Sequence, residues 1–161
     1  MIFVTLGTQN MSFIRLLNEL DCLVDGGYIT EPIIVQAGCT KFQSSNMKIL
    51  DFLPSCKMHE LQSSARFIIT HGGVGSILES LKLRKKVIAI PRMKEYAEHL
   101  NNHQLEIVQL FANKGYILPC YNIAELFSLI QNIEKFTPKI FESNRTDFVI
   151  SLKQIISLLL K

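Results

Sequence analysis

The sequence has few of the features that mark disulfide-rich, metal-binding or membrane-spanning proteins. Its four cysteines form no Cys-x-x-Cys pair and stand at no zinc-site spacing with histidine, so neither a zinc site nor a disulfide framework is predicted. They are typical of reduced thiols in a cytosolic protein. No apolar stretch reaches the roughly 20 residues that a membrane-spanning helix needs, and no basic region precedes the first apolar run.

The sequence also gives little indication of a nucleic-acid partner or of a dinucleotide-binding domain. The formal net charge is only +3, which does not indicate a nucleic acid as partner. Basic residues at 84–86, with Arg92 and Lys94, would suit phosphates or an anionic membrane surface, or would form an ordinary solvated surface. No Gly-x-Gly-x-x-Gly follows the first apolar run with an acidic residue about 20 positions on, which argues against an NAD-binding domain.

What the sequence does contain is a regular alternation of apolar segments. The chain has 161 residues, of which 48% are hydrophobic and 19% charged, as expected for one globular domain over residues 1–161. Apolar runs expected to be strands cover residues 2–6, 33–37, 47–53, 67–69, 86–90 and 116–118. Helical spacing appears between them, and two helices are expected after the last strand, the final one over 145–160. This pattern predicts a single α/β, Rossmann-like domain with a parallel sheet flanked by helices.

The most informative stretch is residues 70–79, Thr-His-Gly-Gly-Val-Gly-Ser-Ile-Leu-Glu, at a predicted strand-to-helix turn. Its glycines allow close approach of a ligand, and the free N–H groups of a helix N-terminus favour phosphate. His71 and Ser76 would add donors, and Glu79 could accept hydrogen bonds from sugar hydroxyls one helical turn later. Alternatively, the glycines serve steric needs alone, His71 is structural and Glu79 merely solubilises its helix.

Two more polar stretches follow predicted strands. Residues 7–9 form a turn after the first strand, which is either a ligand loop or an ordinary turn in which Thr8 or Asn10 caps the next helix. Residues 91–104 follow the fifth strand and are rich in side chains that recognise hydroxyls and carboxylates. This second stretch indicates either part of a site or a polar loop leading into a helix.

These three stretches together resemble the nucleotide-sugar-binding half of family 28 glycosyltransferases. The matching segments are residues 2–8, residues 70–76 with Glu79, and residues 91–104, in the same order. The chain is most similar to the small PssE and EpsF type subunits of bacterial exopolysaccharide and capsule synthesis. It is more distantly similar to MurG and to the catalytic subunit of the dolichol-linked GlcNAc transferase.

The resemblance implies a fold and a set of site residues. The fold would be the C-terminal half of a GT-B enzyme, in which two Rossmann-like halves enclose the active site. Within the donor site, the central turn would face the diphosphate, Glu79 would hold the ribose, and residues 52–53 would bind uracil through their backbone. The donor-binding positions implied are Gly7, Thr8, Phe52, Leu53, His71, Gly72, Gly73, Gly75, Ser76, Glu79, His103 and Gln104, the last two contacting the transferred sugar.

The activity implied is inverting transfer of a hexose, with β-1,4-linked galactose closest to the resemblance, from a UDP-sugar to a lipid-diphosphate-linked sugar. A membrane-associated partner subunit would bind the acceptor and keep this cytoplasmic chain at the inner membrane face. The general base would come from that partner or locally from Glu95, Glu98 or His99.

Neither a metal nor a cofactor is implied. The sequence has no Asp-x-Asp motif, in keeping with a metal-independent site in which the UDP-sugar is a substrate. The alternative is a non-catalytic subunit that stabilises a partner transferase through the broad apolar face of its last helix.

Overall fold

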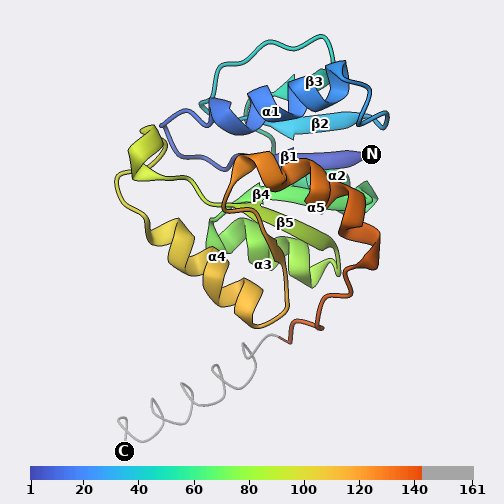
Figure 1. The fold of residues 1–161 in the computed structure, drawn as a ribbon, viewed down its shortest axis with the longest axis vertical. Helices are drawn as coiled ribbons and strands as arrows, with labels where there is room; N and C mark the ends of the chain where they lie inside the picture. Colours follow the sequence, from blue (N-terminus) through green and yellow to red (C-terminus); the bar gives the residue numbers. More distant parts are fainter. Residues whose placement is uncertain (143–161) are drawn as a thin grey trace, which may run out of the picture.

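The computed structural model describes residues 1–142 and contains one six-stranded parallel sheet (Figure 1). The strands are β1 (Ile2–Thr5), β2 (Ile33–Gln36), β3 (Met47–Leu50), β4 (Phe67–His71), β5 (Lys86–Ile90) and β6 (Leu118–Pro119). The helices are α1 (Ile14–Asp25), α2 (Ser55–Ser64), α3 (Val74–Lys82), α4 (His103–Asn113) and α5 (Leu126–Asn132). Short 3-10 turns lie at Lys94–Tyr96, Ile123–Glu125 and Ile133–Lys135.

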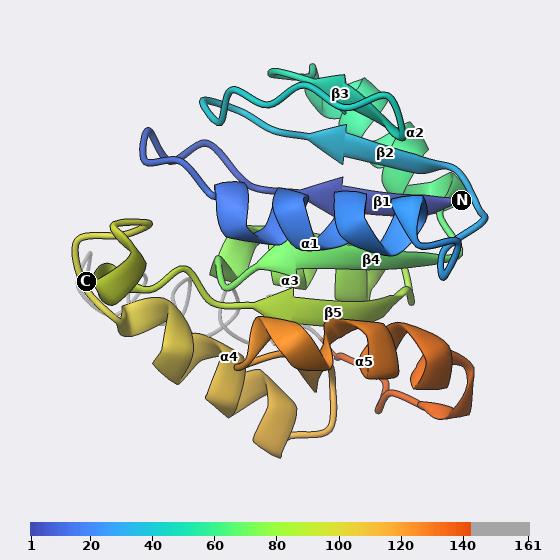
Figure 2. The same ribbon diagram turned by 45° about the horizontal axis from the view of Figure 1, so that its top comes forward.

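Helices cover both faces of the sheet, which explains why the strands are continuous apolar runs. Side chains alternate along β1, so Ile2 and Val4 pack with α1 and α5, while Phe3 packs with α2 on the opposite face. A separate cluster joins α3 and α4 to β5 on that second face. Figure 2 shows α1 and α5 in front of the sheet, with α2 and α3 behind it.

The strand order reverses at the centre of the sheet, between β1 and β4. The order is β3-β2-β1-β4-β5-β6, so the chain runs outward from β1 on one side and from β4 on the other. Ligands of open parallel sheets bind beyond the carboxyl ends of the strands at such a reversal. The turn after β1 and the glycine turn after β4 therefore meet at the expected binding edge, because Thr5 pairs with Thr70.

The predicted Rossmann-like fold with a parallel sheet is confirmed, with differences at element ends. The sixth strand was expected at 116–118, but β6 begins at Leu118. Tyr116 instead closes α4, since its N–H donates to the Phe111 carbonyl. β3 ends at Leu50, which leaves residues 52–53 in a loop, and β4 extends to His71.

Two further expectations concern helices. The predicted helix over 145–160, and with it the expected apolar docking face, lies outside the described residues. Between residues 1 and 142, no helix has the length and apolar composition needed to cross a membrane.

Candidate functional site

The glycine turn leaves the N-terminus of α3 open to a ligand. Gly73 precedes the helix, no side chain caps it, and its first turn holds no acidic residue. Val74 and Gly75 are exposed and Ser76 is half-buried. The first N–H groups of α3 and the positive end of its dipole are therefore available to an anion, as the sequence predicts for a phosphate site.

His71 is packed tightly between the two turns. Its side chain is only 8% exposed, and Nδ1 lies 3.4 Å from the Thr5 carbonyl oxygen. Because a carbonyl can only accept, Nδ1 carries the hydrogen in this contact and Nε2 presents a lone pair. A Cβ added at Gly73 would lie 2.3 Å from Nε2, and one added at Gly7 would lie 2.6 Å from it. The imidazole therefore leaves no room for a Cβ at position 7 or position 73.

The electrostatics of this position keep His71 neutral. Burial lowers the pKa of its imidazole to about 4, and the positive charge of Arg92 acts in the same direction. At neutral pH the ring has no N–H at Nε2, so the donor role predicted for His71 toward a phosphate requires it to take up a proton. An anion bound beside Nε2 would favour that protonation.

We expect acidification to destabilise the free protein through His71. In the unfolded protein the imidazole has its ordinary pKa of 6.5 and binds a proton as the pH falls below that value. In the folded protein it stays neutral down to about pH 4. Between pH 7 and pH 5 this group should lower the free energy of unfolding by about 2 kcal/mol. Urea unfolding at pH 7 and pH 5 measures this decrease. In His71→Gln the free energy of unfolding should fall by about 2 kcal/mol less than in wild type over the same pH interval. An equal loss in the variant would contradict this assignment.

The turn after β1 is held by buried polar side chains. Gly7 has φ +75°, a conformation that favours glycine. Its carbonyl accepts a hydrogen bond of 3.1 Å from Nε2 of Gln36, and the Leu6 carbonyl accepts one of 2.8 Å from Nη2 of Arg92. Gln36 also accepts the Thr5 hydroxyl hydrogen at 2.6 Å. Both carbonyls of this turn are thereby fixed, while Thr8 remains exposed.

Arg92 is a buried structural residue, contrary to the surface role that the sequence suggested. Its side chain is 0% exposed, and Nη1 donates to the carbonyls of Met11 and Glu98. The guanidinium lies over the Phe13 ring, 4.9 Å from its centroid. Burial lowers the pKa of Arg92 to about 10, so the group stays charged at neutral pH. Its contacts join the loops after β1 and β5.

Gln104 joins the ends of β4 and β5. Its Oε1 accepts the Gly72 N–H at 3.0 Å and the Arg92 N–H at 3.1 Å, and its side chain is buried. A Cβ at Gly72 would lie 2.8 Å from the Cβ of Gln104. The amide oxygen of Gln104 is thus used to position the glycine turn.

The candidate bases differ in availability. Glu98 is 3% exposed and forms an ion pair with Arg15 at 2.9 Å, and it also accepts the Met93 N–H. Both of its oxygens already accept hydrogen bonds within the chain, so Glu98 is less available to a substrate than Glu95 or His99. Glu95 is exposed and His99 is half-buried, and both lie in the loop after β5.

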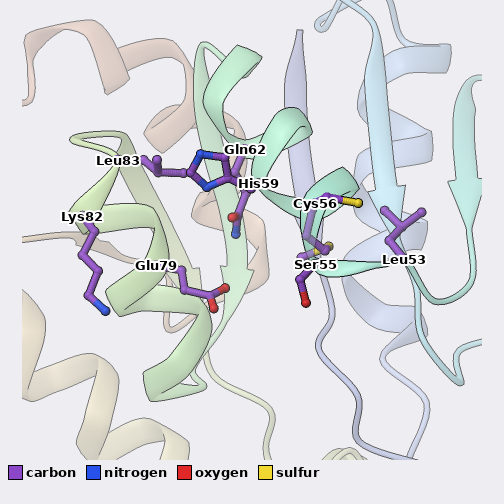
Figure 3. Close-up of a pocket in the computed structure, with 9 residues that line it drawn as sticks. Leu53, Ser55, Cys56, His59, Gln62, Glu79, Lys82 and Leu83 are labelled. Carbon is purple, nitrogen blue, oxygen red and sulfur yellow. The ribbon is translucent and has the colours of Figure 1, made fainter.

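A pocket of about 510 Å³ lies between α2 and α3 (Figure 3). This volume is in the range of about 300–1,000 Å³ typical of small-molecule sites. It brings together two predicted donor-binding residues, Leu53 and Glu79. The other lining residues are Ser55, Cys56, Met58, His59, Gln62, Lys82 and Leu83.

Ten of the twelve predicted donor-binding residues do not line this pocket. Phe52 is 56% exposed in the loop before α2. His103 is exposed at the start of α4, and its Nδ1 lies 3.0 Å from Oε2 of Glu106. Among residues 1–142, no group of three or more His, Cys, Asp or Glu side chains is arranged to hold a metal ion.

Solved structures confirm the fold. The structure superposes on MurG of Acinetobacter baumannii with a TM-score of 0.65 at 18% identity, covering 95% of this chain and 49% of that one. It also superposes on a solution structure of ALG13 with a TM-score of 0.57 at 18% identity, covering 94% and 93% of the two chains. The chain thus has the fold of one half of a GT-B glycosyltransferase.

Sequence comparison gives the family. A UDP-N-acetylglucosamine transferase subunit ALG13 from Candida albicans is 36% identical over 95 residues, covering 59% of this chain and 31% of the relative. The Saccharomyces cerevisiae protein of that name is 32% identical over 78 residues, covering 48% and 37%. The chain thus spans well under half the length of these curated relatives. The family model for the glycosyltransferase family 28 C-terminal domain matches residues 1–159, and the chain belongs to this family.

Proposed function

We propose that this chain is the donor-binding catalytic subunit of an inverting UDP-sugar glycosyltransferase and acts with a partner subunit that binds the acceptor. One observation carries the proposal. The uncapped N-terminus of α3 opens at the carboxyl edge of the sheet, and Glu79, further along the same helix, lines the pocket between α2 and α3. A diphosphate at the helix terminus and a ribose at Glu79 fit this arrangement.

The proposed chemistry is stabilisation of a leaving diphosphate. Negative charge develops on UDP as the glycosidic bond breaks, and fixed N–H groups at the start of α3 stabilise that charge in the transition state. His71 supports this role once protonated at Nε2, because it then donates to the same anion. A base must also deprotonate the acceptor hydroxyl. We assign this step to the partner subunit or to Glu95 or His99.

The proposed donor is a UDP-hexose. The curated relatives are named as UDP-N-acetylglucosamine transferase subunits, which favours UDP-N-acetylglucosamine. The resemblance to the PssE and EpsF type favours UDP-galactose and a β-1,4 linkage in capsule or exopolysaccharide synthesis. In both cases we propose a lipid-diphosphate-linked sugar as acceptor and a membrane-associated partner that keeps this cytoplasmic subunit at the membrane face.

Calorimetric titration of the purified chain tests this proposal and ranks the donors. The ligands are UDP, UDP-N-acetylglucosamine, UDP-galactose, UDP-glucose and UDP-glucuronic acid. We expect saturable binding of UDP and tighter binding of one UDP-sugar, which identifies the donor. A chain that binds none of them, alone or with its partner, would instead support the non-catalytic stabilising role.

Glu79→Ala is expected to lower the affinity for UDP by about 10- to 100-fold, because hydrogen bonds to a charged group contribute about 1.5–3 kcal/mol. Glu60→Ala removes an exposed carboxylate from α2 outside the pocket and serves as control. Wild type should bind 2′-deoxy-UDP more weakly than UDP, whereas Glu79→Ala should bind both equally. Retained discrimination in the variant would rule out a ribose contact.

A further inference from the structure

The pocket between α2 and α3 has the composition of a nucleobase site. Leu53, Met58 and Leu83 supply apolar walls from the loop after β3, from α2 and from α3. Polar groups among the lining residues include the Gln62 amide and the Glu79 carboxylate. A flat base with polar edges needs apolar contact on its faces and a few hydrogen bonds at its rim. The pocket supplies both.

Gln62 carries a buried polar atom that residues 1–142 leave without a hydrogen bond. Its side chain is 2% exposed, and its Nε2 has no hydrogen-bond partner among the residues that the structure describes. An unpaired buried amide donor is destabilising and calls for an explanation. Figure 3 shows the Gln62 amide pointing from α2 into the space between α2 and α3, where the Glu79 carboxylate also points.

Packing does not explain why this residue is a glutamine. Met58 and Leu61 occupy positions i and i+3 on the inner face of α2, and Gln62 occupies position i+4 of the same face. An apolar side chain of similar size would fill this position without an unpaired donor. The amide is therefore better explained by a ligand than by the core.

We propose that Gln62 donates a hydrogen bond from Nε2 to a ring carbonyl of a pyrimidine base bound in this pocket. The inference rests on the proposed function, and it adds a base-recognising side chain to the site. A nucleotide laid along the site has its diphosphate at the N-terminus of α3 and its ribose at Glu79, which directs its base toward α2 and Gln62. Uracil carries two ring carbonyls, at C2 and C4, and either of them can accept the hydrogen bond that the Nε2 donor of Gln62 offers.

Gln62→Met tests the proposal, with Ser63→Ala on the exposed side of α2 as the matched control. Methionine keeps the length of the side chain and removes the amide. We expect the affinity for UDP, measured by calorimetry, to fall about tenfold, as for the loss of one hydrogen bond. The variant should melt at the same temperature as wild type or higher, because the unpaired donor is gone. Ser63→Ala should leave both values unchanged.

Thio-substituted nucleotides separate base recognition from a general packing effect. Wild type should bind either 2-thio-UDP or 4-thio-UDP more weakly than UDP, because sulfur accepts hydrogen bonds poorly. Gln62→Met should bind UDP and that analogue equally. Unchanged UDP affinity in Gln62→Met, or undiminished discrimination against the analogue, would overturn the proposal.

The outcome for Gln62 is separable from that for the proposed function. If wild type binds UDP and Glu79→Ala weakens it while Gln62→Met does not, only the role of Gln62 is rejected. If wild type binds no UDP, both inferences fail.

Discussion

Replacing Arg92 by leucine is expected to lower the free energy of unfolding by about 3–5 kcal/mol. The guanidinium donates to the carbonyls of Leu6, Met11 and Glu98, and these acceptors lose their partner in the variant. Each buried polar group left unpaired costs about 1–3 kcal/mol. Urea unfolding followed by circular dichroism measures the effect.

Two further variants define what Arg92 does. Lys94→Leu removes an exposed charge from the same loop and should change stability by less than about 0.5 kcal/mol. Arg92→Lys keeps the charge but lacks the planar fork that reaches several carbonyls, so it should recover only part of the loss. If Arg92→Leu cost less than about 1 kcal/mol, Arg92 would not be the residue that ties the loops together.

Gly73→Ala is expected to weaken UDP binding at least about 30-fold. The new Cβ would lie 2.3 Å from Nε2 of His71 and 2.9 Å from its Cδ2, so the imidazole must leave its place between the two turns. This displacement changes the position of the N–H groups at the start of α3, and a misplaced donor loses most of its interaction. Calorimetric titration with UDP measures the loss.

Gly75→Ala serves as the control for Gly73→Ala. It shows whether the effect of Gly73→Ala comes from the collision with His71 or from any replacement of a glycine in this turn. A Cβ at Gly75 would meet no atom within 4 Å, and the residue lies in the first turn of α3. The change should raise the melting temperature, because alanine favours the helix over glycine by about 0.5–1 kcal/mol. Gly73→Ala should lower the melting temperature. Equal effects of the two changes would contradict the packing of His71 described above.

The sequence allowed the central layers of the fold to be predicted, because they depend on local patterns. Buried parallel strands appear as continuous apolar runs, and helix faces appear as residues three and four apart. The glycines at 72 and 73 marked the turn before α3 correctly. Their structural need was less visible, since Gly73 accommodates His71 and Gly72 accommodates Gln104.

Long-range polar contacts could not be predicted from the same patterns. Arg92 stands beside Lys94 in a polar stretch, which favoured an exposed position, yet its partner Leu6 is 86 positions away in the sequence. Glu98 likewise pairs with Arg15 across 83 positions. Burial of a charged residue depends on such distant acceptors and donors, and no local spacing encodes them.

Two buried glutamines did carry a sequence signal. Gln36 interrupts the apolar strand Ile33–Gln36 at its last position, and Gln62 stands on the apolar stripe of α2. A polar residue at a position that the periodicity assigns to the core indicates a buried hydrogen bond or a ligand. Gln36 has its partners within the chain, whereas Nε2 of Gln62 has none among residues 1–142.

The most direct test of the central claim is to map UDP on the chain by amide chemical shifts in a two-dimensional NMR titration. We predict that signals from residues 7–8 and 72–76 and from the pocket residues of α2 and α3 shift together and saturate at one affinity. Signals from α5, on the opposite face of the sheet, should stay in place. Shifts confined to other surfaces, or none with UDP, would contradict a donor site formed by the glycine turn and the adjoining pocket.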